Sequence, residues 1–83
     1  MSHQFNIIEE RKLYGLRLEG VRLDRQETLT QVAKAAGTSR RTLRRIEKGE
    51  VDWKILTVAH ICWYYNIRLS TLFANGKHRK LKI

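Results

Sequence analysis

The segment 37–49 constrains the fold of this 83-residue chain more than any other stretch. It reads Gly-Thr-Ser-Arg-Arg-Thr-Leu-Arg-Arg-Ile-Glu-Lys-Gly, and Ser39 is suited to cap the start of a helix while Gly49 is suited to end it. A helix of about ten residues is not stable alone in water. Its apolar residues, Leu43 and Ile46, must therefore dock it on a core formed by the rest of the chain.

The docked helix presents one strongly basic face. At about 100° per residue, its five basic side chains fall within an arc of about 140° and point away from Leu43 and Ile46. Exposed helices usually carry solvated charges of both signs, but the one acid of this segment, Glu47, lies just outside the arc. We interpret the segment as a helix that reads nucleic acid. The five basic residues are Arg40, Arg41, Arg44, Arg45 and Lys48.

Positive charge is concentrated in two places. The formal net charge is +9, and residues 37–49 hold five basic residues and one acid, while residues 77–83 hold four basic residues and no acid. These two segments account for eight of the nine excess charges. Two focused basic patches on a nearly neutral body indicate a polyanionic partner. The C-terminal patch is either a solvated, disordered tail or a basic arm that follows DNA phosphates.

Other function classes lack a signal in the sequence. The length and the hydrophobic content of 42% fit one small domain that folds alone. The single cysteine, Cys62, excludes an internal disulfide and is expected to be a buried thiol. No histidine has metal-ligand spacing, and no carboxylate pair or Ser/His arrangement is evident, so we expect no catalytic site, metal or cofactor. No long apolar run or signal peptide is evident, so we expect a cytoplasmic protein without membrane contact.

The periodicity of apolar residues predicts an all-α fold of five helices. They cover about residues 6–24, 28–36, 39–49, 54–66 and 70–74. The expected core residues are Leu18, Val21, Leu29, Val32, Ala33, Ala36, Leu43, Ile46, Ile55, Val58, Ala59, Ile61, Cys62, Tyr65, Leu72 and Phe73.

The second and third helices form a helix-turn-helix. Thr28 and Gln31 fit a capping box at the start of the second helix, and Gly37-Thr38-Ser39 makes a three-residue turn into the basic helix. The major groove of DNA admits one helix, whose N-terminal residues reach the base edges. Arginine suits this work because its planar fork bonds guanine O6 and N7 together.

A series of short motifs runs through residues 14–73. In order they are Gly15-x-Arg17-Leu18-x-x-Val21-Arg22, Thr28-Leu29-x-Gln31-Val32-Ala33-x-x-x-Gly37-Thr38-Ser39, Thr42-Leu43-x-x-Ile46-Glu47-x-Gly49, Thr57, Ile61 and Asn66-Ile67-x-Leu69-x-x-Leu72-Phe73. Together these residues resemble the lambda-repressor-like, Cro/XRE-type helix-turn-helix family of phage and bacterial regulators. The resemblance implies a five-helix DNA-binding domain that usually acts as a dimer on a palindromic operator.

The resemblance also assigns roles to individual residues. Ser39 would cap the recognition helix and contact phosphate, and Arg22 would pair with Glu47 to clamp that helix in place. Beyond what the resemblance implies, we expect further contacts to DNA phosphates from Arg44, Lys48, the C-terminal tail and the starts of two further helices, at Thr28 and Lys54. The base-reading positions fall on Arg40, Arg41, Thr42 and Arg45.

Three features of the sequence depart from the family pattern. Leu29 stands where many relatives carry a glutamine that bonds phosphate, and Trp53 stands where proline is common. The loop after the third helix is often basic, but here it contains Glu50 and Asp52. These departures put the usual docking pose on DNA in question.

Outside the basic helix, two features leave alternatives open. Leu56, His60 and Trp63 share the face of the fourth helix that points away from the core set, and either neighbouring segments or a second copy would cover them. We divide the chain into an N-terminal extension at 1–13, a helix-turn-helix domain at 14–76 and a basic tail at 77–83. The apolar extension would lengthen the first helix, pack over the fourth helix or join a dimer.

The sequence thus predicts a sequence-specific regulator of transcription that binds double-stranded DNA, with a repressor favoured. Its origin would be a bacterium, a phage or a plasmid. One alternative is an antitoxin-type module that binds a partner protein and binds DNA secondarily. A second is a protein that binds nucleic acid without sequence preference, or RNA, although the basic helix has no aromatic platform for stacking bases.

Overall fold

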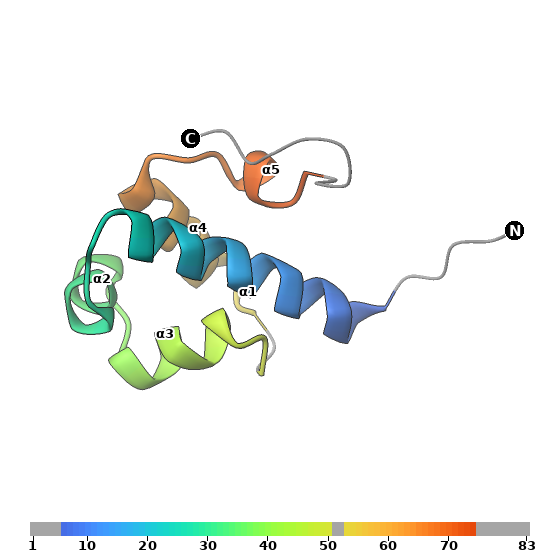
Figure 1. Ribbon diagram of the computed structural model, residues 1–83, viewed down its shortest axis with the longest axis horizontal. Helices are drawn as coiled ribbons and strands as arrows, with labels where there is room; N and C mark the ends of the chain where they lie inside the picture. Colours follow the sequence, from blue (N-terminus) through green and yellow to red (C-terminus); the bar gives the residue numbers. More distant parts are fainter. Residues whose placement is uncertain (1–5, 51–52, 75–83) are drawn as a thin grey trace, which may run out of the picture.

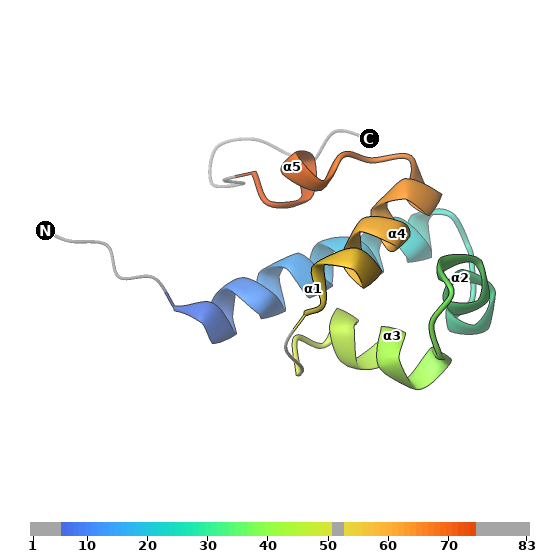
Figure 2. The same cartoon turned by 180° about the vertical axis from the view of Figure 1, so that it is seen from behind.

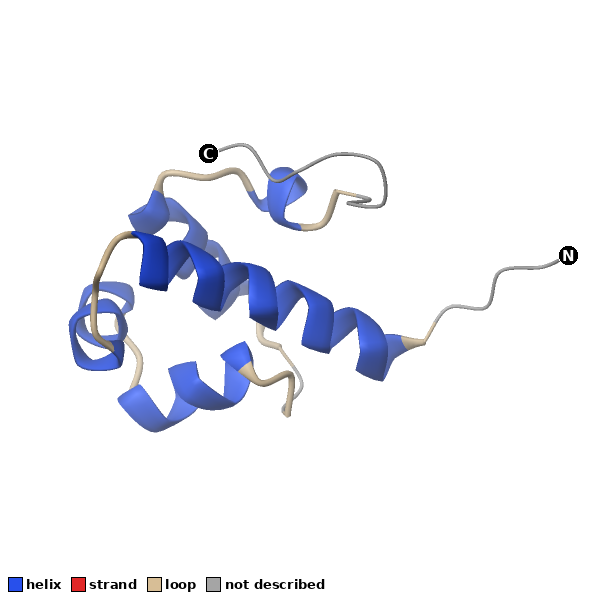
Figure 3. Cartoon of the chain, viewed as in Figure 1, coloured by secondary structure: helices blue, strands red, loops and turns tan. Residues whose placement is uncertain are grey.

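The longest helix, α1 (Ile7–Asp24), runs through the middle of the molecule. The computed structural model describes residues 6–50 and 53–74, and within these ranges it contains five α-helices and no strand (Figures 1 and 3). Helix α3 lies along one side of α1 and α5 along the other, with α4 behind (Figures 1 and 2). The predicted all-α, five-helix fold is confirmed. The other helices are α2 (Leu29–Ala36), α3 (Arg40–Glu47), α4 (Ile55–Tyr65) and α5 (Leu69–Leu72).

Side-chain caps begin the first three helices. The Asn6 side chain accepts hydrogen bonds from the backbone N–H groups of Ile8 and Glu9, which fixes the start of α1. Thr28 and Gln31 form the predicted capping box of α2. The Ser39 hydroxyl accepts from the Thr42 N–H at 3.0 Å and so begins α3 at the predicted residue.

Left-handed residues end the first four helices. Gly37 and Gly49 have φ of +71° and +69°, a conformation that glycine adopts without a steric penalty. Each belongs to a Schellman motif, in which two backbone N–H groups return to carbonyls of the last turn. Asn66 ends α4 in the same way, as predicted. Gln26 does so after α1, with a residue type that gives no such signal in the sequence.

A single apolar core lies between the five helices, with α5 contributing Leu72. Most of the predicted core residues are buried, while Leu29, Ala59 and Phe73 are half-buried at its edge. The prediction for Ile55 was wrong, since this residue is exposed. It lies in the first turn of α4, at the border of the buried arc of that helix. The buried apolar residues are Leu18, Val21, Val32, Ala33, Ala36, Leu43, Ile46, Val58, Ile61, Cys62, Tyr65, Ile67 and Leu72.

Two glycines bring the backbones of α1 and the end of α3 into contact. A Cβ atom on Gly15 would lie 2.4 Å from the Glu47 carbonyl oxygen and 2.6 Å from that of Ile46. A Cβ atom on Gly49 would lie 2.8 Å from the Cα atom of Lys12. No side chain fits at either position without moving the backbone. The glycine pair therefore sets how closely α3 sits against α1.

Helix α1 is continuous across residue 13, so residues 7–13 lengthen the first helix. This is one of the three alternatives for the N-terminal extension. The side chains of Ile7 and Ile8 are exposed at its outer end. Residues 1–5, residues 75–76 at the end of the predicted domain and the basic tail at 77–83 lie outside the described residues.

Candidate nucleic-acid interface

The outward face of α3 carries five exposed cations. Because Leu43 and Ile46 are buried, the helix can present only its opposite side to solvent. None of the five cations forms a hydrogen bond or an ion pair with another residue of the described ranges. Their donors are therefore available to an anion from outside. The five are Arg40, Arg41, Arg44, Arg45 and Lys48.

Four of these cations surround an open hollow on the α3 surface. It is lined by Arg41, Arg44, Arg45 and Lys48, and also by the acidic residue Glu50. Four neighbouring positive charges create a strong local potential for an anion such as a phosphate. The Glu50 carboxylate weakens this potential. Thus the structure brings together four of the nine predicted nucleic-acid contacts around the hollow, with one opposing charge among them.

The hydroxyl groups of Ser39 and Thr42 are hydrogen-bonded to each other at the start of α3. The Ser39 hydroxyl donates to Thr42 Oγ1 at 2.9 Å, in addition to accepting from the Thr42 N–H. The hydroxyl hydrogen of Thr42 remains available as a donor to a ligand. Arg40 and Arg41 follow Ser39 directly, at the exposed start of the helix. The predicted reading residues therefore begin at a rigidly capped helix end.

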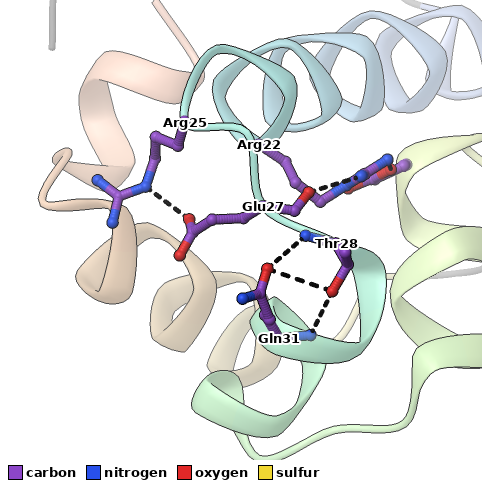
Figure 4. A network of polar contacts seen from close by, with 6 residues as sticks. Arg22, Arg25, Glu27, Thr28 and Gln31 are labelled. Carbon is purple, nitrogen blue, oxygen red and sulfur yellow. Dashed lines mark hydrogen bonds and ion pairs between the residues drawn. The ribbon is translucent and has the colours of Figure 1, made fainter.

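Arg22 and Glu47 join α3 to α1. Arg22 Nε and Nη2 lie 2.9 and 3.1 Å from the two Glu47 carboxylate oxygens, and their side chains are 11% and 3% exposed. Arg22 Nη1 also donates to the Glu27 carbonyl oxygen at 3.1 Å (Figure 4). The hydrogen bonds that Arg22 donates to Glu47 raise the pKa of Arg22, against the effect of burial. One guanidinium thus connects α1, the turn before α2, and α3.

A second network holds α4 against the same turn. The Glu27 carboxylate accepts a hydrogen bond from Arg25 Nε at 2.7 Å (Figure 4). It also accepts one from the Tyr64 hydroxyl. Both bonds, chiefly that from Tyr64, lower the pKa of Glu27. The Arg25 guanidinium also lies 5.3 Å from the centre of the Tyr64 ring. The sequence did not predict this network, because Tyr64 follows no motif and lies 37 residues from Glu27.

Comparison with known families identifies the fold. The family model of a Cro/C1-type helix-turn-helix DNA-binding domain matches residues 11–74. The chain belongs to this family. DNA is therefore the partner class of this Cro/C1-type domain, and the predicted resemblance is confirmed. No curated protein matches the chain closely.

Trp53, which stands where proline is common in the family, has a structural role in this Cro/C1-type domain. Trp53 packs against Tyr14 and Phe73, with ring centres 6.1 and 6.3 Å away, and these two rings meet edge to face at 4.9 Å. Arg17 lies beside this cluster and donates to the carbonyl oxygens of Leu72 and Ala74 at 2.6 and 2.7 Å. No role for Arg17 beyond its place in a family motif could be predicted from the sequence. The cluster and Arg17 fasten α5 and the loop before α4 onto α1.

The remaining predicted site residues lie apart from the hollow. Thr28 is exposed at the start of α2, where its hydroxyl is occupied by the capping box. Lys54 is exposed at the start of α4 and makes no side-chain cap hydrogen bond. Leu56, His60 and Trp63 are exposed on the outward side of α4. Neither α1 nor any other described element covers them.

Metal-binding and membrane-spanning features are absent from the part of the chain that the structure describes. No group of three or more His, Cys, Asp or Glu side chains there could hold a metal ion. No helix in those ranges is long and apolar enough to cross a membrane.

Proposed function

We propose that this Cro/C1-type protein is a sequence-specific regulator of transcription that inserts α3 into the major groove of double-stranded DNA. Arg40, Arg41 and Arg45 donate to base edges, with guanine O6 and N7 as their preferred acceptors. Thr42 contributes a hydroxyl or a methyl contact. The observation that carries this proposal is the exposed basic face of a short helix, whose five cations make no ion pair within the described residues and whose other side is packed against α1.

Phosphate contacts fix the position of the helix in the groove. Arg44, Lys48 and Ser39 lie on or beside the reading face and are suited to bind the sugar–phosphate backbone. Thr28 and Lys54 contribute from the starts of α2 and α4, where unpaired backbone N–H groups favour anions. These contacts carry the part of the affinity that does not depend on sequence.

We favour a repressor that acts as a homodimer in the cytoplasm. A repressor can block transcription simply by occupying its operator. It therefore needs no protein surface other than the reading helix and a dimer contact. One α3 of eight residues contacts only one half-site, and two copies related by a two-fold axis read an inverted repeat. The half-sites then lie about one helical turn apart.

Selection from random duplex DNA at about physiological salt tests this function, because non-specific binding there is no tighter than about micromolar. We expect recovery of an inverted repeat with guanine in each half-site. Recovery of no motif, together with binding that vanishes as salt rises, would mean that the arginines supply only charge. Arg41→Ala should weaken binding to the selected site more than binding to random DNA, while Lys48→Ala should weaken both alike.

The exposed leucines of α1 favour a second candidate, an antitoxin-type module that binds a partner protein. Leu16 and Leu23 lie seven residues apart on the helix and are 61% and 58% exposed. A partner helix could pack on this stripe. Co-expression with the product of an adjacent gene tests this candidate. A complex that Leu16→Glu disrupts would support it, and separate elution of the two proteins would contradict it.

A further inference from the structure

Helix α4 presents an outward face without charge. The eleven residues of α4 include no Lys, Arg, Asp or Glu, although 30% of the whole chain is charged. Trp63 is 79% exposed and Leu56 is 70% exposed, and no described element packs on them. We call this surface the α4 face, and it consists of Ile55, Leu56, Ala59, His60 and Trp63.

The lack of charge indicates which partner the α4 face fits. The chain carries a net charge of +9, so two copies repel each other wherever their basic surfaces meet. In a two-fold symmetric pair, both copies use the same patch. A charged residue near the axis therefore lies close to the same charge on the partner copy and is repelled by it. Aliphatic, aromatic and imidazole side chains avoid this repulsion. The exposed leucines of α1, by contrast, are interspersed with Glu9, Lys12 and Glu19.

The order of side-chain sizes along the α4 face suits an antiparallel pair. Ile55, Ala59 and Trp63 are spaced four residues apart, so they form one row along the helix with the small residue in the middle. If Ala59 lies on the two-fold axis, Ile55 meets the partner's Trp63 at both ends of the row. Leu56 then lies beside the partner's His60. The small central residue lets the two helices approach closely.

We propose that the α4 face binds the α4 face of a second copy of this chain, with the helices antiparallel and Ala59 at the two-fold axis. This inference deepens the proposed function, because it names the partner that completes the operator-binding unit. Figure 2 shows α4 on the near side of the molecule and α3 along its lower edge, so the pairing leaves α3 uncovered. A helix of this length buries less than a standard interface, so the dimer is in a concentration-dependent equilibrium with monomer.

Sedimentation equilibrium of the wild type, Trp63→Glu and Leu16→Glu tests the surface. We expect the wild type to dimerise at high concentration, Trp63→Glu to raise the dimer dissociation constant at least tenfold, and Leu16→Glu to leave it unchanged. Both variants replace an exposed apolar residue by the same acid, and circular dichroism checks that each is folded. A monomeric wild type, an unchanged dissociation constant for Trp63→Glu or an equally raised one for Leu16→Glu would overturn the proposal.

Disulfide trapping tests the antiparallel register. Two Ala59→Cys side chains would meet at the two-fold axis within reach of a disulfide. The native Cys62 is only 2% exposed and does not compete. Under mild oxidation, Ala59→Cys should become a covalent dimer much faster than Leu16→Cys, which places the thiol on α1. Equal rates for the two variants would contradict the register.

A duplex with a single half-site keeps this inference separate from the proposed function. Trp63→Glu should bind one half-site as tightly as the wild type and should lose affinity only for the inverted repeat. If the wild type binds its half-site no more tightly than random DNA, the proposed function itself is contradicted. Equal affinity of Trp63→Glu and the wild type for the inverted repeat would count against dimerisation through α4.

Discussion

The Arg22 guanidinium holds the Glu47 carboxylate through two hydrogen bonds of 2.9 and 3.1 Å in a site almost closed to solvent. Glu47 belongs to the helix with the basic face but lies on its inward side. The ion pair therefore fixes the rotation of α3 about its axis without reducing the positive charge that faces outward. In this way a structural contact determines which side chains reach a ligand.

Loss of either partner of this pair should be costly. Arg22→Met leaves the Glu47 carboxylate buried without a cation and should lower the free energy of unfolding by about 3–5 kcal/mol. The double variant Arg22→Met/Glu47→Met removes both charges and should recover most of that loss. Urea unfolding of the variants measures these values.

Arg25→Met provides the matched control for Arg22→Met. Arg25 also pairs with a glutamate, Glu27, but its side chain is 41% exposed. An exposed ion pair contributes about 1 kcal/mol or less, so this variant should be only slightly destabilised. Equal losses for Arg22→Met and Arg25→Met would show that burial of the Arg22–Glu47 pair has no special importance.

Alanine substitutions at two glycines of α1 should change the stability of the fold in opposite directions. Gly15→Ala places a methyl group against the backbone of α3 and should destabilise the fold by about 1–3 kcal/mol. A Cβ atom on Gly20 would have no neighbour within 4 Å, so Gly20→Ala should stabilise α1 by about 0.5–1 kcal/mol. Thermal unfolding followed by circular dichroism measures both. A stabilising Gly15→Ala would refute the close contact between α1 and α3.

Removal of the acid in the basic hollow should strengthen DNA binding. Glu50 lines the hollow with four cations, and its charge opposes a phosphate bound there. Glu50→Gln should lower the Kd for duplex DNA about threefold to tenfold at low salt, since one repulsion at contact distance is worth about 1 kcal/mol in water. Fluorescence anisotropy measures the change. Asp24→Asn removes a charge away from the hollow and should leave Kd unaltered; an equal gain would point to net charge alone.

The buried thiol should make stability depend on alkaline pH. Burial raises the pKa of Cys62 from 9.0 to about 11. The unfolded thiol therefore ionises first, so its contribution to stability is complete below pH 9 and is lost as the pH rises towards 11. Between these values the wild type should lose stability more steeply than Cys62→Ala in urea unfolding. Parallel curves would mean that the thiol is already accessible to water in the fold.

Local rules were enough to predict the helices and the exposed basic face of α3. Thr28, Ser39 and Gly49 each act on neighbours within one helical turn, so their effects can be derived from short stretches of sequence. The arc of basic residues follows in the same way from helical periodicity, once Leu43 and Ile46 are assigned to the core. The error at Ile55 arose at the border of a buried arc, where periodicity does not decide exposure.

Long-range contacts could not be derived in this way. In the sequence, Gly15 only lowers the helix propensity of its segment. Its structural role, to leave room for the backbone of Glu47, depends on a different helix. The bonds from Arg17 to the end of α5 and from Tyr64 to Glu27 also join distant segments. Such contacts depend on the packed arrangement of helices and leave no periodic signal. The Arg22–Glu47 pair was expected only through the family resemblance.

Chemical substitution of guanine in the selected DNA site tests the central claim most directly. Replacing the guanines of each half-site by 7-deazaguanine removes an acceptor from the major groove, and replacing them by hypoxanthine removes the amino group from the minor groove. If α3 reads guanine through its arginines, 7-deazaguanine should weaken binding about tenfold or more, and hypoxanthine should have little effect. Full affinity for the 7-deazaguanine duplex would contradict major-groove reading by α3.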